Sequence, residues 1–326
     1  TTPELLRARI REAEGHAVCG FAVNAGVMPG ADLEGMWNAG AMAFGETFAA
    51  PSSYSEGLDP ETLGGLFARI HALGGLATVH AEEVSGPAPT TLTAHDNARS
   101  GAGEARAVRA ASALAPGGMR LHFCHMSTAA SIEAARGMVE VTPHHLFLSR
   151  EMFEEDDTRA RMNPPLRDEQ TRRGLWACWD KIDVIASDHA PHTLREKALP
   201  FQIAPSGVPG VETMVPLLVA AVRNRRITLA SVIEKTSWRP AAILGIPRAG
   251  FEPGDRADFA LYPDEVTRID ASRLHAKCGW SPFEGLNAVF PEEVVVRGRR
   301  AYSCGEYYEP QPAWYPGQGF LSAEDK

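Results

Sequence analysis

The stretch that decides the fold is Ile182-Asp183-Val184-Ile185-Ala186, followed by Ser187-Asp188-His189-Ala190-Pro191-His192-Thr193. Its first five residues form an apolar run that predicts a buried strand of a parallel sheet. The strand would deliver Asp188 and His192 to its C-terminal end, where the active site of a (β/α) barrel lies. An aspartate there could bind a metal ion or transfer a proton, and a histidine could hold an anionic substrate. The alternative is an aspartate that caps a turn beside an exposed histidine.

Two other segments place histidine at the end of a predicted strand. They are residues 76–82, which contain His80, and residues 119–127, which contain His122 and His125. Because strand side chains alternate, His122 and His125 would point to opposite faces, with His122 packed against helices. Any one of these histidines could equally be structural. Two histidines and an aspartate from three strands nevertheless resemble the ligands of a catalytic zinc site.

Length and composition narrow the class of protein. The chain has 326 residues, 44% hydrophobic and 22% charged, enough for one barrel-sized domain and a smaller piece. A formal net charge of −9 without a basic cluster argues against nucleic-acid binding. No apolar run is long enough to span a membrane. The five cysteines are widely spaced and form no Cys-x-x-Cys pair, which predicts reduced thiols and a cytoplasmic protein.

Helical and strand patterns alternate over most of the chain, which predicts a parallel sheet with crossover helices. A helix is expected after Asp59 and another over residues 104–115. After about residue 250 the pattern changes to short antiparallel strands, of which the hairpin at residues 293–302 is the clearest. We therefore expect a barrel domain over residues 1–250 and a C-terminal β segment and tail over residues 251–326.

Short motifs rich in histidine, proline and acidic residues follow one another along nearly the whole chain: Thr78-Val79-His80-Ala81-Glu82, residues 122–128, 141–146, Met162-Asn163-Pro164-Pro165-Leu166-Arg167, 187–193, Glu196-Lys197, 207–213 and 280–285. Together they resemble dihydroorotases of the long-chain bacterial branch of the cyclic amidohydrolase superfamily. The Asn-Pro-Pro-Leu-Arg and Asp-His-Ala-Pro-His-Thr motifs are fairly specific for dihydroorotases, whereas hydantoinases and allantoinases share the metal histidines. The resemblance implies a TIM-type (β/α) barrel, an α/β fold, with a small C-terminal β segment.

The same resemblance implies a metal centre and a reaction. His80 and His125 would bind a metal ion, and Asp188 would bind the other ion and act as the proton shuttle. The implied cofactor is zinc, as one or two divalent ions, which would activate water and polarise the amide carbonyl. The implied reaction is the reversible hydrolysis of dihydroorotate to N-carbamoyl-aspartate in pyrimidine biosynthesis.

Three further positions would hold the substrate's ring and carboxylate, namely Asn163, His192 and the backbone at Gly207. On the sequence alone, Asn163 could equally be a turn residue before two prolines. His144 and His145 carry no expected role beyond a structural loop.

The beginning of the chain departs from the family pattern. Dihydroorotases open their barrel with a strand that ends in His-x-His, and no His-x-His occurs in these 326 residues. The chain begins at Thr1 with sequence that resembles the family after its first strands. We therefore expect the first barrel strands to be missing from this chain, and residues 1–326 alone to be poorly stable and nearly inactive.

The bridging position departs as well. Relatives place a carboxylated lysine or an aspartate at the end of a strand that resembles residues 41–44, where this chain has Gly45 followed by Glu46. Glu46 could bridge two metal ions or be a solvated loop acid. The loop at residues 51–55 also differs from the usual pattern and could shape a different pocket.

Three functions stay open on the sequence. The first is a dihydroorotase, and the second is another cyclic amidohydrolase, such as an allantoinase or hydantoinase. The third is a catalytically inactive, dihydroorotase-like structural partner of aspartate transcarbamoylase, which the missing His-x-His favours and which Asp188, His192 and Asn163 argue against. The expected partners are a small cyclic amide and either a second copy of the chain or aspartate transcarbamoylase.

Overall fold

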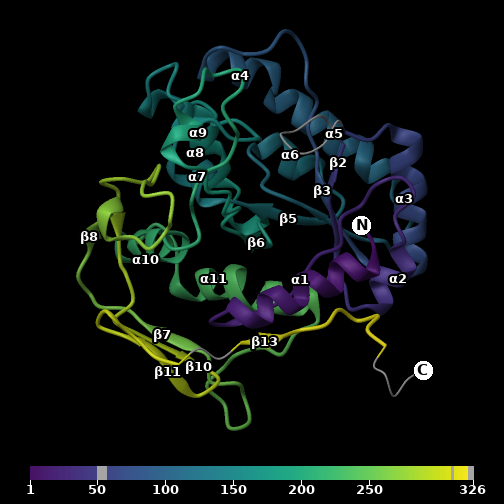
Figure 1. The fold of residues 1–326 in the computed structure, drawn as a ribbon. Helices are drawn as coiled ribbons and strands as arrows, with labels where there is room; N and C mark the ends of the chain where they lie inside the picture. The colour runs from purple at the N-terminus through teal and green to yellow at the C-terminus, as the bar shows by residue number, and fades with distance from the viewer. Residues whose placement is uncertain (50–56, 310–311, 322–326) are drawn as a thin grey trace.

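A parallel sheet forms the centre of the molecule (Figure 1). The computed structural model describes residues 1–49, 57–309 and 312–321, so the predicted loop at 51–55 lies outside the described residues. The sheet has the order β2-β3-β4-β5-β6. Its strands are β2 (Phe44–Phe48), β3 (Leu76–His80), β4 (Arg120–Phe123), β5 (Met138–Val141) and β6 (Val184–Ile185). Isolated parallel bridges extend it beside β2, from Ala25 to Phe44, and beyond β6, from His189 to Val208.

Helices precede, connect and follow the strands of this sheet, as the alternating pattern predicted. They are α1 (Pro3–His16), α2 (Leu33–Asn38), α3 (Pro60–Ala72), α4 (Leu92–Ala98), α5 (Gly101–Leu114), α6 (Ala129–Ala134), α7 (Pro143–Phe147), α8 (Glu169–Ala177), α9 (Leu194–Lys197), α10 (Met214–Arg223), α11 (Leu229–Ile233) and α12 (Arg239–Leu244). Short 3-10 turns lie at Arg150–Met152, Thr158–Ala160, Trp179–Lys181 and Ala271–Arg273, with a π-helical turn at Glu234–Trp238.

Helix α3 shows how the local sequence produces these elements. The Asp59 side chain accepts a hydrogen bond from the backbone N–H of Thr62, which caps the helix. Pro60 is the first helical residue, where its missing N–H leaves no partner unsatisfied. Apolar side chains at helical spacing are buried on one side: Leu63, Leu66, Phe67 and Ile70.

The main core lies between the sheet and the helices that cover one of its faces. Ala77 and Val79 of β3 point into this core, and so do Leu121 and Phe123, their partners on β4. Because side chains alternate along a strand, His80 points to the opposite face. The sheet therefore presents its polar side chains toward the inside of the partial barrel.

The C-terminal part of the chain forms an antiparallel sheet of the order β12-β11-β10-β7. Figure 1 shows β7, β10 and β11 gathered at one end of the molecule, away from α4. Its strands are β7 (Phe259–Leu261), β10 (Glu293–Val296), β11 (Arg299–Ser303) and β12 (Glu306–Tyr307). The pairing of β10 with β11 confirms the predicted hairpin. A domain boundary at residue 250 stays a prediction.

Two small strand pairs complete the fold. Strand β8 (Thr267–Arg268) pairs with β9 (Asn287–Ala288), and β1 (Gly20–Phe21) pairs in parallel with β13 (Ala313–Trp314). All five cysteines are unpaired. In the described parts of the chain, none of the helices has the length and apolar character needed to cross a bilayer.

Candidate metal centre

Three side chains converge on one side of the parallel sheet: Glu46 from within β2, His80 from the end of β3 and His125 from just after β4. Oε1 of Glu46 lies 2.6 Å from Nε2 of His125 and 3.8 Å from Nδ1 of His80. The two imidazole nitrogens lie 3.1 Å apart. Around a tetrahedral zinc ion with bonds near 2.0–2.1 Å, neighbouring ligand atoms are about 3.3 Å apart. The two nitrogens and one oxygen therefore fit a divalent ion such as zinc.

A buried carboxylate orients His80 in this group. Oε2 of Glu82 lies 2.6 Å from Nε2 of His80 and accepts a hydrogen bond from Arg99 at 2.6 Å. The side chains of all three residues are buried. With Nε2 bound to Glu82, the ring directs Nδ1 toward Glu46 and His125. Carboxylate–histidine pairs of this kind fix the ring and the tautomer of metal-binding histidines.

The prediction that His122 packs against helices is wrong. His122 pairs in register with Thr78, so both point to the inner face of the sheet, and Nε2 of His122 lies 2.9 Å from the Glu140 carboxylate. His125 reaches the same side because β4 has already ended at Phe123 and the backbone turns. Its φ of 39° is in the left-handed region, which residues other than glycine rarely adopt.

The charges of the group also suit a cation. Burial opposes ionisation of Glu46, but the charge and hydrogen bond of His125 outweigh it and lower the pKa of Glu46 to about 2. Burial likewise opposes protonation of His125, but the Glu46 carboxylate outweighs it and raises the pKa of His125 to about 10. Oε1 of Glu46 is buried, and the His125 ring is its close partner. A divalent ion bound here would replace the imidazole proton.

Asp188 stands beside this group. It follows β6, as predicted, and its φ of 45° is again left-handed. Burial is the main cause that raises the pKa of Asp188 to about 6, against the attraction of His125. Its Oδ2 lies 3.9 Å from Nε2 of His144. Asp188 is outside the close group of three ligand atoms that Glu46, His80 and His125 form.

His144 and His145 differ, although the sequence suggested a structural loop for both. His145 contacts Oγ1 of Thr142 at 2.9 Å and the carbonyl of Pro164 at 3.0 Å, which is a structural role. His144 is buried, and neither ring nitrogen has a hydrogen-bond partner among the described residues. Burial, assisted by His145, holds the pKa of His144 well below its usual range. Sequence reasoning missed this neighbour of Asp188, although it too follows a strand, β5.

The three predicted substrate-binding residues lie together around Ser206. Its carbonyl is 3.0 Å from Nε2 of His192, and its hydroxyl donates to Oδ1 of Asn163 at 3.3 Å. Gly207 has a φ of 127°, and a Cβ added there would lie 3.3 Å from the His192 ring. The Gly207 N–H donates to the carbonyl of Arg161 at 3.0 Å. Because the N–H of Gly207 is used in this bond, the carbonyl of Gly207 is the backbone group that could contact a ligand.

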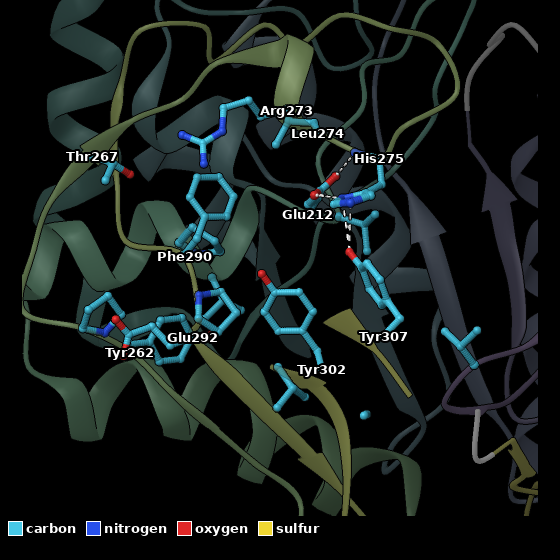
Figure 2. Close-up of a pocket in the computed structure, with 18 of the residues that line it drawn as sticks. Glu212, Tyr262, Thr267, Arg273, Leu274, His275, Phe290, Glu292, Tyr302 and Tyr307 are labelled. Carbon is cyan, nitrogen blue, oxygen red and sulfur yellow. Dashed lines mark hydrogen bonds and ion pairs between the residues drawn. The ribbon is translucent and has the colours of Figure 1, made fainter. Parts of the chain in front are cut away.

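A cavity of about 720 Å³ lies apart from these residues, between α10 and the C-terminal sheet. Figure 2 shows Glu212, His275 and Tyr307 joined on one of its walls. The Glu212 carboxylate lies 2.6 Å from Nδ1 of His275, and the Tyr307 hydroxyl lies 3.0 Å from Nε2. No predicted metal ligand or substrate-binding residue lines this cavity. Its size therefore carries no argument about the metal centre.

Comparison with known proteins identifies the family of this chain. No protein-family model matches the chain. The chain is 38% identical over 320 residues to a dihydroorotase of Methanosarcina acetivorans, covering 89% of this chain and 68% of that protein. It is 36% identical over 350 residues to a dihydroorotase of Methanosarcina mazei, covering 97% and 76%. The chain belongs to the dihydroorotase family. The predicted class of metal-dependent cyclic amidohydrolase is thereby confirmed.

Solved structures support the predicted fold of this dihydroorotase family member. An L-hydantoinase (dihydropyrimidinase) from Arthrobacter aurescens aligns with a TM-score of 0.86 at 24% identity, covering 97% of this chain and 78% of that one. A D-hydantoinase (dihydropyrimidinase) from Thermus sp. aligns with a TM-score of 0.87 at 21% identity, covering 98% and 78%. This likeness confirms the amidohydrolase barrel fold. The closer sequence identity to dihydroorotases favours that interpretation over a hydantoinase.

Proposed function

We propose that this protein interconverts dihydroorotate and N-carbamoyl-aspartate by reversible hydrolysis of the cyclic amide, a step of pyrimidine biosynthesis. The observation that carries the proposal is the convergence of Glu46, His80 and His125 from three neighbouring strands, in a chain of the dihydroorotase family. A hydantoinase could share the two histidines. The choice of dihydroorotate over other cyclic amides therefore rests on the dihydroorotase relatives.

Zinc is the proposed cofactor, held by Nδ1 of His80, Nε2 of His125 and Oε1 of Glu46. A donor set of two imidazoles and one carboxylate is typical of catalytic zinc. When bound, a zinc ion lowers the pKa of a water molecule and polarises the amide carbonyl. The close group would hold one ion, and a second ion would draw on Asp188.

Asp188 is the proposed proton shuttle. As the water oxygen bonds to the carbonyl carbon, the carboxylate of Asp188 accepts the water proton. It then returns the proton to the ring nitrogen as the carbon–nitrogen bond breaks, so the step needs no further reactant. His144, whose pKa burial holds well below its usual range, lies 3.9 Å from this carboxylate.

Asn163 and His192 are the proposed donors to the substrate carboxylate, and the carbonyl of Gly207 is the proposed acceptor from a ring N–H. Hydrogen bonds to an ionised carboxylate are stronger than bonds between neutral groups. The arrangement around Ser206 supports this assignment because it holds all three positions at one place.

A substrate panel tests the proposed function. The protein, loaded with zinc, is offered dihydroorotate, dihydrouracil, hydantoin and allantoin at equal concentrations. We expect kcat/KM to be highest for dihydroorotate and to fall to background in Glu46→Gln. Preference for a ring without a carboxylate would overturn the proposal, and so would the absence of dihydroorotate turnover with zinc, cobalt and manganese.

The assembly and location of the protein also stay proposals. We expect a cytoplasmic enzyme that binds neither nucleic acid nor membrane and that forms a homodimer or a complex with aspartate transcarbamoylase. Mass measurement by light scattering, with and without aspartate transcarbamoylase, distinguishes these two assemblies.

A further inference from the structure

A buried lysine lies behind the candidate substrate site. Lys197 is the last residue of α9, and only 2% of it is exposed. Its ammonium group donates to three backbone carbonyls, those of Thr158 at 3.0 Å, Arg161 at 3.1 Å and Pro205 at 2.8 Å. The Asp157 carboxylate attracts this ammonium group electrostatically but is not among its hydrogen-bond partners in the described residues. Lys197 therefore uses its three donors on main-chain atoms alone.

These carbonyls belong to the two segments that carry predicted substrate-binding residues. Arg161 lies two residues before Asn163, and its carbonyl also accepts the N–H of Gly207. Pro205 directly precedes Ser206, whose carbonyl lies 3.0 Å from the His192 ring. A single ammonium group thus connects the segment that ends at Asn163 with the segment that ends at Gly207.

The third predicted substrate-binding residue is tied to the same lysine through α9. His192 precedes the helix cap at Thr193, where Thr193 and Glu196 bond reciprocally. The indole N–H of Trp280 donates to the His192 carbonyl at 2.7 Å, and Nζ of Lys197 lies 5.8 Å from the Trp280 ring. The backbone of His192 is therefore held by the hydrogen bond from Trp280 and by the capped helix that follows it.

Burial of this lysine is unfavourable on its own. Burial, together with the nearby Arg161, lowers the pKa of Lys197 to about 7. Asp157 offsets this only in part. A buried charge without a directly bonded carboxylate is expensive, so a chain that needed only packing here would be better served by an apolar side chain. The three directed bonds are what a lysine adds at this position.

We propose that Lys197 is a positioning residue for the substrate site, whose three bonds set the spacing of Asn163, His192 and Gly207. It contacts no substrate and acts through the segments that it joins. The inference rests on the proposed function for the identity of the ligand. The order that Lys197 imposes on residues 158–163 and 205–207 can be measured without any ligand.

Lys235 offers a matched control. It is also buried, donates to one backbone carbonyl, that of Ile182, at 2.6 Å, and lies 5.5 Å from a tryptophan ring, that of Trp179. Ile182 precedes β6, so this lysine serves the end of the strand opposite Asp188. Lys197→Met and Lys235→Met therefore each remove a buried ammonium group, the first beside the predicted substrate-binding residues and the second at the start of β6.

The experiment compares these variants in the full zinc-loaded chain. We expect Lys197→Met to raise KM for dihydroorotate about tenfold or more, because small displacements of binding groups are costly. Its kcat and zinc content should stay within about twofold of wild type, since the loss is one of substrate binding. Lys235→Met should leave KM unchanged. A Lys197→Met protein with wild-type KM overturns the proposal, and so does an equal rise in KM in both variants.

Two additions keep the test decisive. If Lys197→Met fails to fold, Lys197→Gln retains amide donors and should show a smaller rise in KM; wild-type KM there overturns the proposal. Hydrogen exchange in residues 158–163 and 205–207 should be faster in the Lys197 variant than in Lys235→Met, and unchanged exchange overturns the proposal. A wild-type protein that hydrolyses no dihydroorotate counts against the proposed function, whereas the exchange result still judges the role of Lys197.

Discussion

At the scale of single residues, His122 and His125 are a natural pair of variants because they are neighbours with different partners. Nε2 of His125 faces Glu46 and His80, whereas Nε2 of His122 is occupied by Glu140. We expect His125→Ala to lose most of its bound zinc after dialysis and His122→Ala to keep most of it. Zinc per chain is measured by elemental analysis, and equal loss in both variants would contradict the assignment.

The two proposed hydrogen-bond donors to the substrate carboxylate give a second prediction. Asn163→Ala and His192→Ala should each lower kcat/KM for dihydroorotate by about 10- to 150-fold, which corresponds to about 1.5–3 kcal/mol for a hydrogen bond to a charged group. Steady-state kinetics at saturating zinc provide the measurement. Wild-type kinetics in both variants would remove these residues from the substrate site.

Variants of Glu82 and Glu83 distinguish two effects on zinc affinity: orientation of His80 by its carboxylate partner, and the loss of a negative charge. Glu82 is buried against His80 and Arg99, whereas the partly exposed Glu83 pairs with Arg106. Glu82→Gln should weaken zinc affinity about 10- to 100-fold, as expected when the partner of a metal-binding histidine is removed. Glu83→Gln should leave it unchanged. Competition with a chelator measures both, and similar affinities would argue against a role of Glu82 in orienting His80.

At the scale of elements, Lys197 at the end of α9 should make the free energy of unfolding depend on pH. The pKa of Lys197 is lowered from 10.5 to about 7, so between these values the unfolded chain binds more protons there than the folded one. Stability from this group therefore rises with pH above about 7 and is lost as pH falls toward 7. Lowering a pKa by one is equivalent to about 1.4 kcal/mol, so the free energy of unfolding should change by a few kcal/mol over this range.

Urea unfolding at pH 7 and pH 9 tests this sign. The free energy of unfolding of wild type relative to Lys197→Met should increase between the two pH values. Lys277→Met, which removes an exposed lysine, is the control and should show no such change relative to wild type. If the free energy of unfolding of wild type relative to Lys197→Met stays constant or falls between pH 7 and pH 9, the lowered pKa of Lys197 is contradicted.

The elements also show what local sequence can and cannot predict. Strand ends at His80 and Asp188 were predictable because an apolar run and its polar end are neighbours in sequence. The face of His122 was not, since alternation fails once a strand ends and the backbone turns at His125. Lys197 was missed as a buried group because a lysine in sequence normally indicates an exposed position.

At the scale of the whole molecule, distant parts of the chain meet. Strand β13 pairs with β1, and Figure 1 shows α1 running beside β13. The backbone of Gly317 donates to Gly40 at 3.0 Å, and the Trp314 ring lies 5.0 Å from that of Phe320. The parallel sheet could be predicted from alternating elements. This pairing could not, because nearly 300 residues separate its two-residue strands.

Trp314 is therefore expected to matter for the stability of the N-terminal part. Trp314→Ala should lower the free energy of unfolding by about 2 kcal/mol, since much of the apolar area of a large ring returns to water. Tyr308→Ala, an exposed aromatic in the same part of the chain, should change it by less than half as much. Denaturant titration gives both values, and equal effects would mean that the β1–β13 pairing adds little.

The identity of the residue at position 46 has a consequence for how the protein acquires its ion. A carboxylated lysine obtains its metal-binding carboxylate only by capturing carbon dioxide after the chain has been made. Glu46 carries its carboxylate from translation onward, 2.6 Å from His125. With Glu46 as ligand, assembly of the centre depends on the supply of ion and on acidity, and is indifferent to the dissolved gas of the surroundings.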